Sequence, residues 1–177
     1  MDEGYLPLAG GTDYYPARVG RPITDNLLDI TALAGLGGVF LTEAGSGFGS
    51  GAKIGALATW RDCCRAELPE SLLALAQAAR EVGGWQVQNR GTVGGNLCNA
   101  SPAADGTVAL LALGGIVELI CKKSVSGQVQ SRYLKVDEFV LGNRLTALSQ
   151  GELLTSVTLP ARSNRAKSAF VKLGHRR

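Results

Sequence analysis

Residues 88–105 read QNRGTVGGNLCNASPAAD and carry the densest pattern in the chain. Small and polar residues dominate most of this stretch. It closes on Ser101 and Pro102, a typical helix start with serine as the cap and proline at the first helical position. The pattern therefore predicts a long polar loop that leads into a helix over residues 103–113. Asp105 is expected in the first turn of that helix, where a carboxylate complements the helix dipole.

A second glycine-rich turn lies near the start of the chain, where the apolar residues 5–9 predict a short buried strand that ends at Gly10 and Gly11. Adjacent glycines reach left-handed conformations that other residues avoid. Such turns aim backbone N–H groups and short hydroxyls into one concavity, as a phosphate group requires. Two glycine-threonine turns, residues 9–13 and 91–96, are thus either plain structural turns or a joint site for the two phosphates of a dinucleotide. Neither has the sequence of a P-loop or of a Rossmann fingerprint.

Hydrophobic periodicity and helix-start signals predict the other elements. Thr59 is expected to cap a helix that begins at Trp60, and Pro69 is expected to open a second helix that ends at Gly83 and Gly84. The mainly apolar run at residues 27–30 predicts a strand covered on both faces. Further strands are expected at residues 39–41, 53–56, 116–121, 128–134, 153–159 and 168–173, with hairpin turns at residues 43–51 and 124–127.

Composition excludes several classes of protein. The chain has 177 residues, of which 45% are hydrophobic, and a net charge of +3, which suits one sizeable core and gives no argument for nucleic acid. Its longest apolar run falls short of the roughly 20 residues that a membrane helix needs, and no signal peptide is visible. Four cysteines without metal-site spacing and a single histidine predict reduced cytoplasmic thiols, no metal site and no catalytic triad. Chemistry supplied by a bound cofactor fits this lack of acid–base groups.

Several stretches resemble one protein family in the same order along the chain: residues 8–13, 86–97 and 100–105, with weaker matches at residues 54–56 and 152–160. The sequence is similar to the FAD-binding domain of the molybdenum hydroxylases, which include xanthine dehydrogenase and the medium subunit of carbon monoxide dehydrogenase. The resemblance implies an α+β fold of the vanillyl-alcohol-oxidase (PCMH) type. A small N-terminal α/β lobe, about residues 1–56, would precede a larger lobe, about residues 57–177, with a mostly antiparallel sheet and helices.

The resemblance also implies a cofactor and its contacts. FAD is expected between the two lobes with its pyrophosphate on the two glycine turns, and no catalytic or metal-binding residue is expected on this chain. The positions that match family contacts are Leu8, Ala9, Gly10, Gly11, Thr12, Asp13, Tyr14, Thr92, Gly94, Gly95, Asn96, Asp105, Leu154 and Lys172, with Val82 as a further candidate.

The function that the resemblance implies is electron transfer. Electrons would pass from the 2Fe–2S clusters of a small partner subunit to FAD and on to NAD⁺ or another acceptor, and a large partner subunit would hold the molybdopterin. This chain lacks the cysteine spacing of a 2Fe–2S cluster, which agrees with that division. Two alternatives stay open: a truncated, flavin-free scaffold that docks on the same partners, and a stand-alone flavin oxidoreductase of the same fold. Neither nucleic acid nor a membrane is expected as a partner.

The sequence departs from the family pattern in three places. Gln88 stands where the family usually has arginine, so one positive charge beside the cofactor loop is missing. The opening strand and helix that the family has before the first glycine turn are absent, and so is its small C-terminal domain. We therefore expect a thinner sheet in the first lobe, which would weaken FAD binding.

Overall fold

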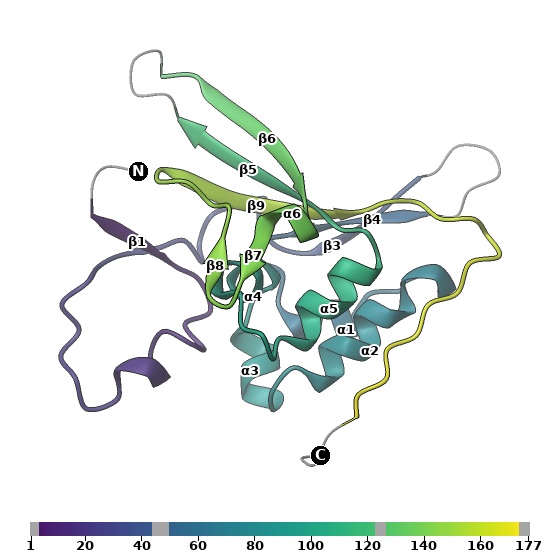
Figure 1. Cartoon of the computed structure of the whole chain (residues 1–177), viewed down its shortest axis with the longest axis horizontal. Helices are drawn as coiled ribbons and strands as arrows, with labels where there is room; N and C mark the ends of the chain where they lie inside the picture. Colours follow the sequence, from purple (N-terminus) through teal and green to yellow (C-terminus); the bar gives the residue numbers. More distant parts are fainter. Residues whose placement is uncertain (1–3, 44–49, 123–126, 174–177) are drawn as a thin grey trace.

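The computed structural model describes residues 4–43, 50–122 and 127–173, and its main feature is an antiparallel sheet with helices on one face (Figure 1). The strand order in this sheet is β3-β4-β9-β5-β6. Its strands are β3 (Val39–Thr42), β4 (Gly51–Gly55), β9 (Glu152–Leu159), β5 (Ile116–Lys122) and β6 (Val129–Lys135). These strands confirm five of the expected ones, and the turns of the two predicted hairpins lie largely outside the described residues.

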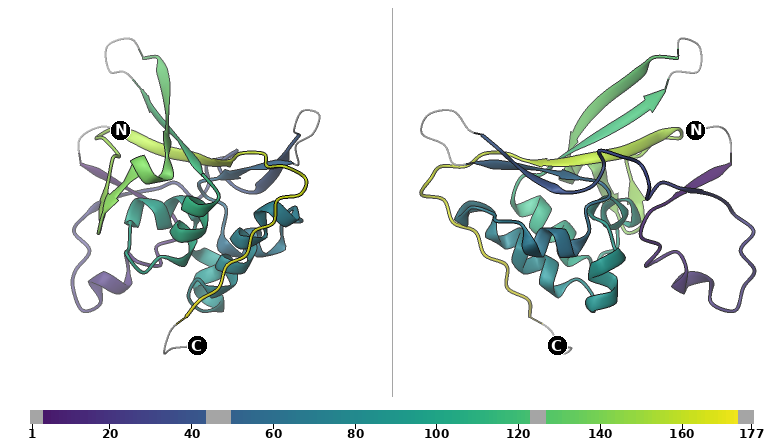
Figure 2. Two further views of the ribbon diagram at one scale, coloured as in Figure 1. Left: turned by 45° about the vertical axis from the view of Figure 1, so that its right-hand side comes forward. Right: turned by 180° about the vertical axis from the view of Figure 1, so that it is seen from behind.

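Helices pack together on the underside of this sheet in each view (Figure 2). They are α1 (Trp60–Arg65), α2 (Leu73–Glu81), α3 (Trp85–Arg90), α4 (Val93–Asn99), α5 (Asp105–Ala112) and the single turn α6 (Val136–Phe139). The core lies between the two layers and includes Ile54, Val117 and Val157 from the sheet and Trp60, Leu75, Leu97 and Leu110 from the helices. None of the helices in the described ranges is long and apolar enough to cross a membrane.

Helix α1 begins where the sequence predicts, because Thr59 and Asp62 cap it reciprocally. The Thr59 hydroxyl accepts a hydrogen bond from the Asp62 N–H at 3.2 Å, and the Asp62 carboxylate accepts one from the Thr59 N–H at 2.8 Å. This capping box fixes the position of Trp60, which is 1% exposed. A Cβ on Gly106 of α5 would overlap the Trp60 ring, so the cap also sets how α1 packs on α5.

A small parallel sheet holds the N-terminal segment away from the main layers (Figure 2). Its strands are β1 (Tyr5–Leu8) and β2 (Asn26–Asp29), joined by a loop that contains a 3₁₀ turn (Pro16–Arg18). The predicted burial of the two strands is wrong for Tyr5, Leu6 and Leu28, which are exposed, whereas Ile30 just after β2 is buried. Sheet pairing joins β3 to β4 and β4 to β9, so these two N-terminal strands lie in the same sheet as β9, β5 and β6. The lobe division near residue 56 stays a prediction.

The predicted polar loop over residues 88–102 is wrong, since the end of α3 and all of α4 occupy most of it. Thr92 acts as an N-cap whose hydroxyl accepts the Gly95 N–H at 3.1 Å, and this cap allows a helix despite two glycines. Helix α5 starts at Asp105, later than predicted. Residues 101–104 form a separate turn before the helix, in which the Ala104 N–H donates a 3.1 Å hydrogen bond to the Ser101 carbonyl.

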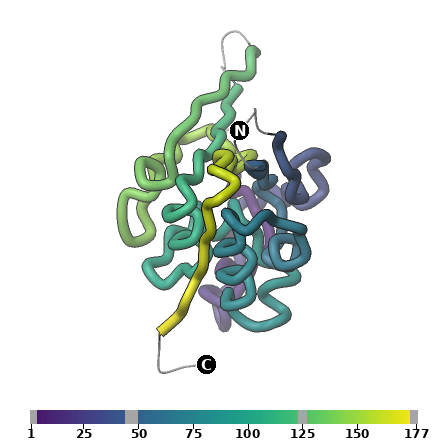
Figure 3. The backbone as a smooth tube through the Cα atoms, turned by 90° about the vertical axis from the view of Figure 1, so that its right-hand side faces the viewer, coloured from purple at the N-terminus to yellow at the C-terminus, as the bar shows by residue number. Residues whose placement is uncertain are grey.

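The predicted final strand over residues 168–173 is also wrong. This segment is extended but pairs with no strand, and it runs along α2 instead (Figure 3). The Ala74 N–H donates to the Ser168 hydroxyl at 3.0 Å, and the Phe170 N–H donates to Gln77 Oε1 at 2.7 Å. The partial burial of Ser168 and Phe170 therefore reflects contact with a helix rather than with a sheet edge.

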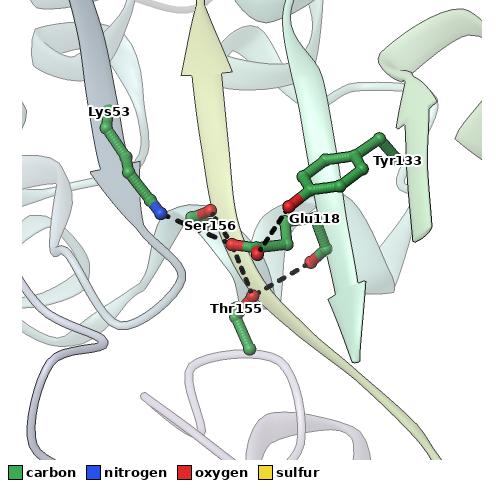
Figure 4. Close-up of polar contacts among 5 residues, drawn as sticks. All are labelled: Lys53, Glu118, Tyr133, Thr155 and Ser156. Atoms are coloured by element: carbon green, nitrogen blue, oxygen red, sulfur yellow. Dashed lines mark hydrogen bonds and ion pairs between the residues drawn. The ribbon is translucent and has the colours of Figure 1, made fainter. Parts of the chain in front are cut away.

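A polar cluster spans the sheet face opposite the helices, centred on the Glu118 carboxylate of β5 (Figure 4). Glu118 accepts hydrogen bonds from Ser156 at 2.8 Å, Thr155 at 3.2 Å and Tyr133 at 3.1 Å, and pairs with Lys53 at 3.5 Å. These hydrogen bonds, above all the one from Ser156, hold the pKa of Glu118 below its ordinary value of 4.5. One carboxylate thus links β4, β9, β5 and β6.

We expect Glu118→Gln to lower the free energy of unfolding at pH 7 by about 1–2 kcal/mol, because it removes the charge that four donors share. The stabilisation by Glu118 is complete above its ordinary pKa of 4.5 and is lost as the pH falls through the lower pKa of the folded state. Urea unfolding from pH 7 down to about pH 3 should therefore show the variant and the native chain converging at low pH. Glu67→Gln, at an exposed site, is the control; a constant gap at every pH would contradict the assignment.

Candidate functional site

A pocket of about 480 Å³ opens between the N-terminal segment and the helices, within the range typical of ligand sites. The first glycine turn and its flanks, residues 6–14, supply one part of the lining. Ala17 and Arg18 of the same segment also line the pocket. A second part comes from α1, the residue after α2, α3, α4 and the link between these last two helices, and from the turn between the short strands β7 (Val140–Gly142) and β8 (Leu145–Thr146). The residues of this second part are Trp60, Val82, Val87, Gly91, Thr92, Gly95, Asn96, Cys98, Asn99 and Arg144.

The two glycine-threonine turns meet in a backbone contact at the base of this pocket. A Cβ on Gly10 would overlap the Arg90 carbonyl oxygen and lie 3.1 Å from Gly91 Cα. A Cβ on Gly91 would in turn lie 3.4 Å from the Thr12 hydroxyl oxygen. Only glycine allows this approach, so the residues that the sequence singled out in two distant segments share one pocket.

The backbone donors of the two turns differ. In the second turn the amides are used internally: Val93 donates to Ala58 O and Gly94 to Ala56 O, each at 2.9 Å, and Gly95 donates to the Thr92 hydroxyl. The amides of residues 9–14, in contrast, donate to no acceptor in the described part of the chain. The expectation that both turns offer free amides is therefore wrong for the second turn, and the first turn alone presents a cluster of free donors to an anion.

Side chains of α4 add polar groups to the pocket. The Asn96 carboxamide oxygen accepts from the Thr107 hydroxyl at 3.2 Å, and its nitrogen has no acceptor within the described ranges. Asn99 Oδ1 accepts a hydrogen bond from the Arg144 guanidinium. The second turn thus offers side-chain donors where its backbone donors are already used.

Arg18 is a lining cation whose charge is already balanced. Its guanidinium lies 2.6 Å from the Asp25 carboxylate and 3.7 Å from the centre of the Tyr14 ring. The Tyr14 hydroxyl donates to the same carboxylate at 2.6 Å. Hydrogen bonds from Tyr14 and then Arg18 hold the pKa of Asp25 below its usual value. This trio orders the outer edge of the loop that carries the first glycine turn.

Most of the predicted contact residues line the pocket: residues 8–14, Thr92, Gly95, Asn96 and the further candidate Val82. Gly94 does not, because its Cα packs against Ala56, and Leu154 is buried in the core. Asp105 and Lys172 also lie outside the lining and pair with each other at 2.7 Å. The role of each of these residues towards a cofactor stays a prediction.

Sequence reasoning missed several lining residues, notably Trp60, Cys98, Asn99 and Arg144. Local patterns give no signal for Arg144, which bonds a residue 45 positions away. Trp60 was recognised only as the start of a helix. Among the other thiols, Cys63 is buried, and burial raises its pKa to about 12, which makes it a poor nucleophile. Within the described ranges, no three His, Cys, Asp or Glu side chains come together as metal ligands.

A glycine turn with free amides, facing polar side chains across a pocket, defines a domain that binds a phosphate-bearing ligand. Residues 2–162 match the family described as the FAD binding domain in molybdopterin dehydrogenase, and the chain belongs to that family. The predicted recognition and α+β fold class are thereby confirmed, and FAD is the cofactor of the family.

Known proteins that this chain resembles are molybdopterin-family dehydrogenases. It is 36% identical to the glyceraldehyde dehydrogenase medium chain of Sulfolobus acidocaldarius, over 87% of this chain and 51% of that one. It is 34% identical to the nicotinate dehydrogenase FAD-subunit of Eubacterium barkeri, over 96% and 55%. The structure of carbon monoxide dehydrogenase from Hydrogenophaga pseudoflava superposes with a TM-score of 0.74 at 28% identity, covering 92% of this chain and 53% of that one. The chain spans about half the length of these relatives.

We expect Gly10→Ala to lower the free energy of unfolding by about 1–3 kcal/mol, because its methyl group would push the first turn off the Arg90 carbonyl. Gly37→Ala is the matched control, since a Cβ there meets no atom within 4 Å. Urea unfolding measures both. Equal stability of the two variants would show that the backbone contact under the pocket does not constrain the fold.

Proposed function

We propose that this chain is the flavin-holding, electron-transfer part of a molybdopterin-dependent dehydrogenase, with FAD in the pocket between the first glycine turn and α4. The observation that carries the proposal is the free amide cluster of residues 9–14 in a chain of an FAD-binding family. Bound FAD would supply the redox chemistry. The protein's own work would be to bind and orient the cofactor.

The pocket residues fit the two ends of such a cofactor. The amides of residues 9–14, which have no acceptor among the described residues, and the Asn96 carboxamide suit a diphosphate. Apolar side chains of the same lining, Leu8, Val82 and Val87, suit a flat aromatic group. The opposing characters of these two sets favour a ligand with one charged part and one apolar part.

The proposed partners follow from the relatives. Several are named as a medium chain, a medium subunit or an FAD-subunit, which supports an assembly in which other subunits carry the molybdopterin and the 2Fe–2S clusters. In that assembly, electrons would arrive from the clusters and leave to NAD⁺ or another acceptor. Reconstitution with the partner subunits would identify that acceptor and the oxidised substrate.

We expect the full chain to bind FAD, seen as quenched flavin fluorescence and as a rise in the free energy of unfolding of about 2.7 kcal/mol at a hundredfold excess over the Kd. Asn96→Asp should weaken FAD binding by about tenfold or more, because an isosteric negative charge replaces the free amide beside the phosphates. Asn89→Asp is the matched control, because Asn89 lies outside the pocket lining and accepts a hydrogen bond from Arg61. The affinity of this variant for FAD should match that of the native chain.

The outcomes separate the alternatives. A folded native chain that binds no FAD would overturn the proposed function and leave the flavin-free scaffold. Equal loss of affinity in Asn96→Asp and Asn89→Asp would place the phosphates elsewhere on the surface.

A further inference from the structure

We propose that Arg144 supplies the positive charge that holds the diphosphate of the dinucleotide, opposite the free amides of the first glycine turn; this inference rests on the proposed function. Arg144 lies in the two-residue turn between β7 and β8, far in sequence from both glycine turns. It nevertheless lines the same pocket.

Charge pairing distinguishes Arg144 from the other arginine of the lining. Arg18 is held by the Asp25 carboxylate, so its charge is balanced. Arg144 has no carboxylate partner among the residues that the structure describes, and its guanidinium touches only the neutral carboxamide of Asn99. A lining cation without a counter-ion favours an anionic ligand in the space that it faces.

The backbone at Arg144 points to a constraint on its side chain. Arg144 has φ +57°, and its N–H donates at 2.9 Å to the carbonyl of Ala100, which itself has φ +44°. Both values lie in the left-handed region, which glycine adopts far more readily than arginine or alanine. An arginine at such a position points to a role for its side chain, because its backbone conformation favours glycine.

The contact with Asn99 also orients the guanidinium. Nη1 donates to Asn99 Oδ1, which ties the arginine to the end of α4, while Nε and Nη2 donate to no described residue. A guanidinium fixed at one corner, with its remaining donors free, matches the paired oxygens of a phosphate group. The diphosphate would thus lie between backbone amides on one side and one oriented arginine on the other.

The test compares FAD affinity of the full chain and its variants at low and high ionic strength, by flavin fluorescence. Arg144→Gly removes the guanidinium and suits the positive φ, so its unfolding midpoint should equal or exceed that of the native chain. Its Kd for FAD should rise about tenfold or more at about 20 mM salt and much less at about 500 mM, because salt screens the lost charge. Arg144→Lys should recover part of the affinity. Arg65→Gln removes an exposed charge from α1 outside the pocket and should leave the Kd unchanged.

Three results would overturn the inference. A Kd for Arg144→Gly within about twofold of the native value at low salt would show that the diphosphate does not contact Arg144, while the proposed function stands. An equal loss at both salt concentrations would assign Arg144 a packing role instead of an electrostatic one. Failure of the native chain itself to bind FAD would remove the proposed function and this inference together.

Discussion

The pocket depends on the contact between Gly10 and the Arg90–Gly91 peptide. This peptide is itself fixed, because the Gly91 N–H donates to Val87 O at 2.6 Å and the Gly91 carbonyl accepts the Trp60 N–H at 3.2 Å. The first glycine turn therefore rests on a backbone that α1 and α3 hold in place. The small sheet β1–β2 is largely exposed and has little core of its own, so its place relative to the helices relies on this approach. Any side chain at Gly10 would open the interface from which the pocket is formed.

Two glycine pairs that look alike in sequence have different roles in the structure. Gly94 uses its small size to pack against Ala56, and its N–H holds α4 to the segment that follows β4. Gly10 also packs closely, against the Arg90 carbonyl, but the amides of residues 9–14 have no acceptor in the described part of the chain and line the pocket. The first arrangement positions a helix and the second can bind an anion. A glycine-threonine motif therefore indicates an anion site only where the amides that it carries are free.

Local signals predicted local structure well in this chain. The Thr59 and Asp62 cap, the strands of the main sheet and the end of α2 two residues before Gly83 all depend on neighbours in sequence, which a local pattern contains. Burial and partners depend on distant residues, and there the predictions failed. Residues 168–173 are extended like a strand but contact a helix, and Leu28 is exposed although its strand was expected to be covered on both faces. The same holds for the pocket. The sequence predicts its glycine turns, whereas the contact between Arg144 and Asn99 depends on the fold.

Charged residues in and around the site differ in whether they already have a partner in the protein, and those without one are available to a ligand. Lys172 pairs with Asp105 and also lies 3.5 Å from the Glu81 carbonyl, so it joins the end of α2 to the start of α5 beside Val82 of the pocket. A cofactor that contacts Asp105 or Lys172 can leave their ion pair intact or can replace one of the two partners. Replacement of one partner leaves the charge of the other unpaired. Gln88 likewise donates to Arg80 O at 2.9 Å and lies outside the lining, so its lack of charge leaves the pocket itself unchanged. An arginine without a carboxylate partner carries no such cost, because it gains a counter-ion when an anion binds.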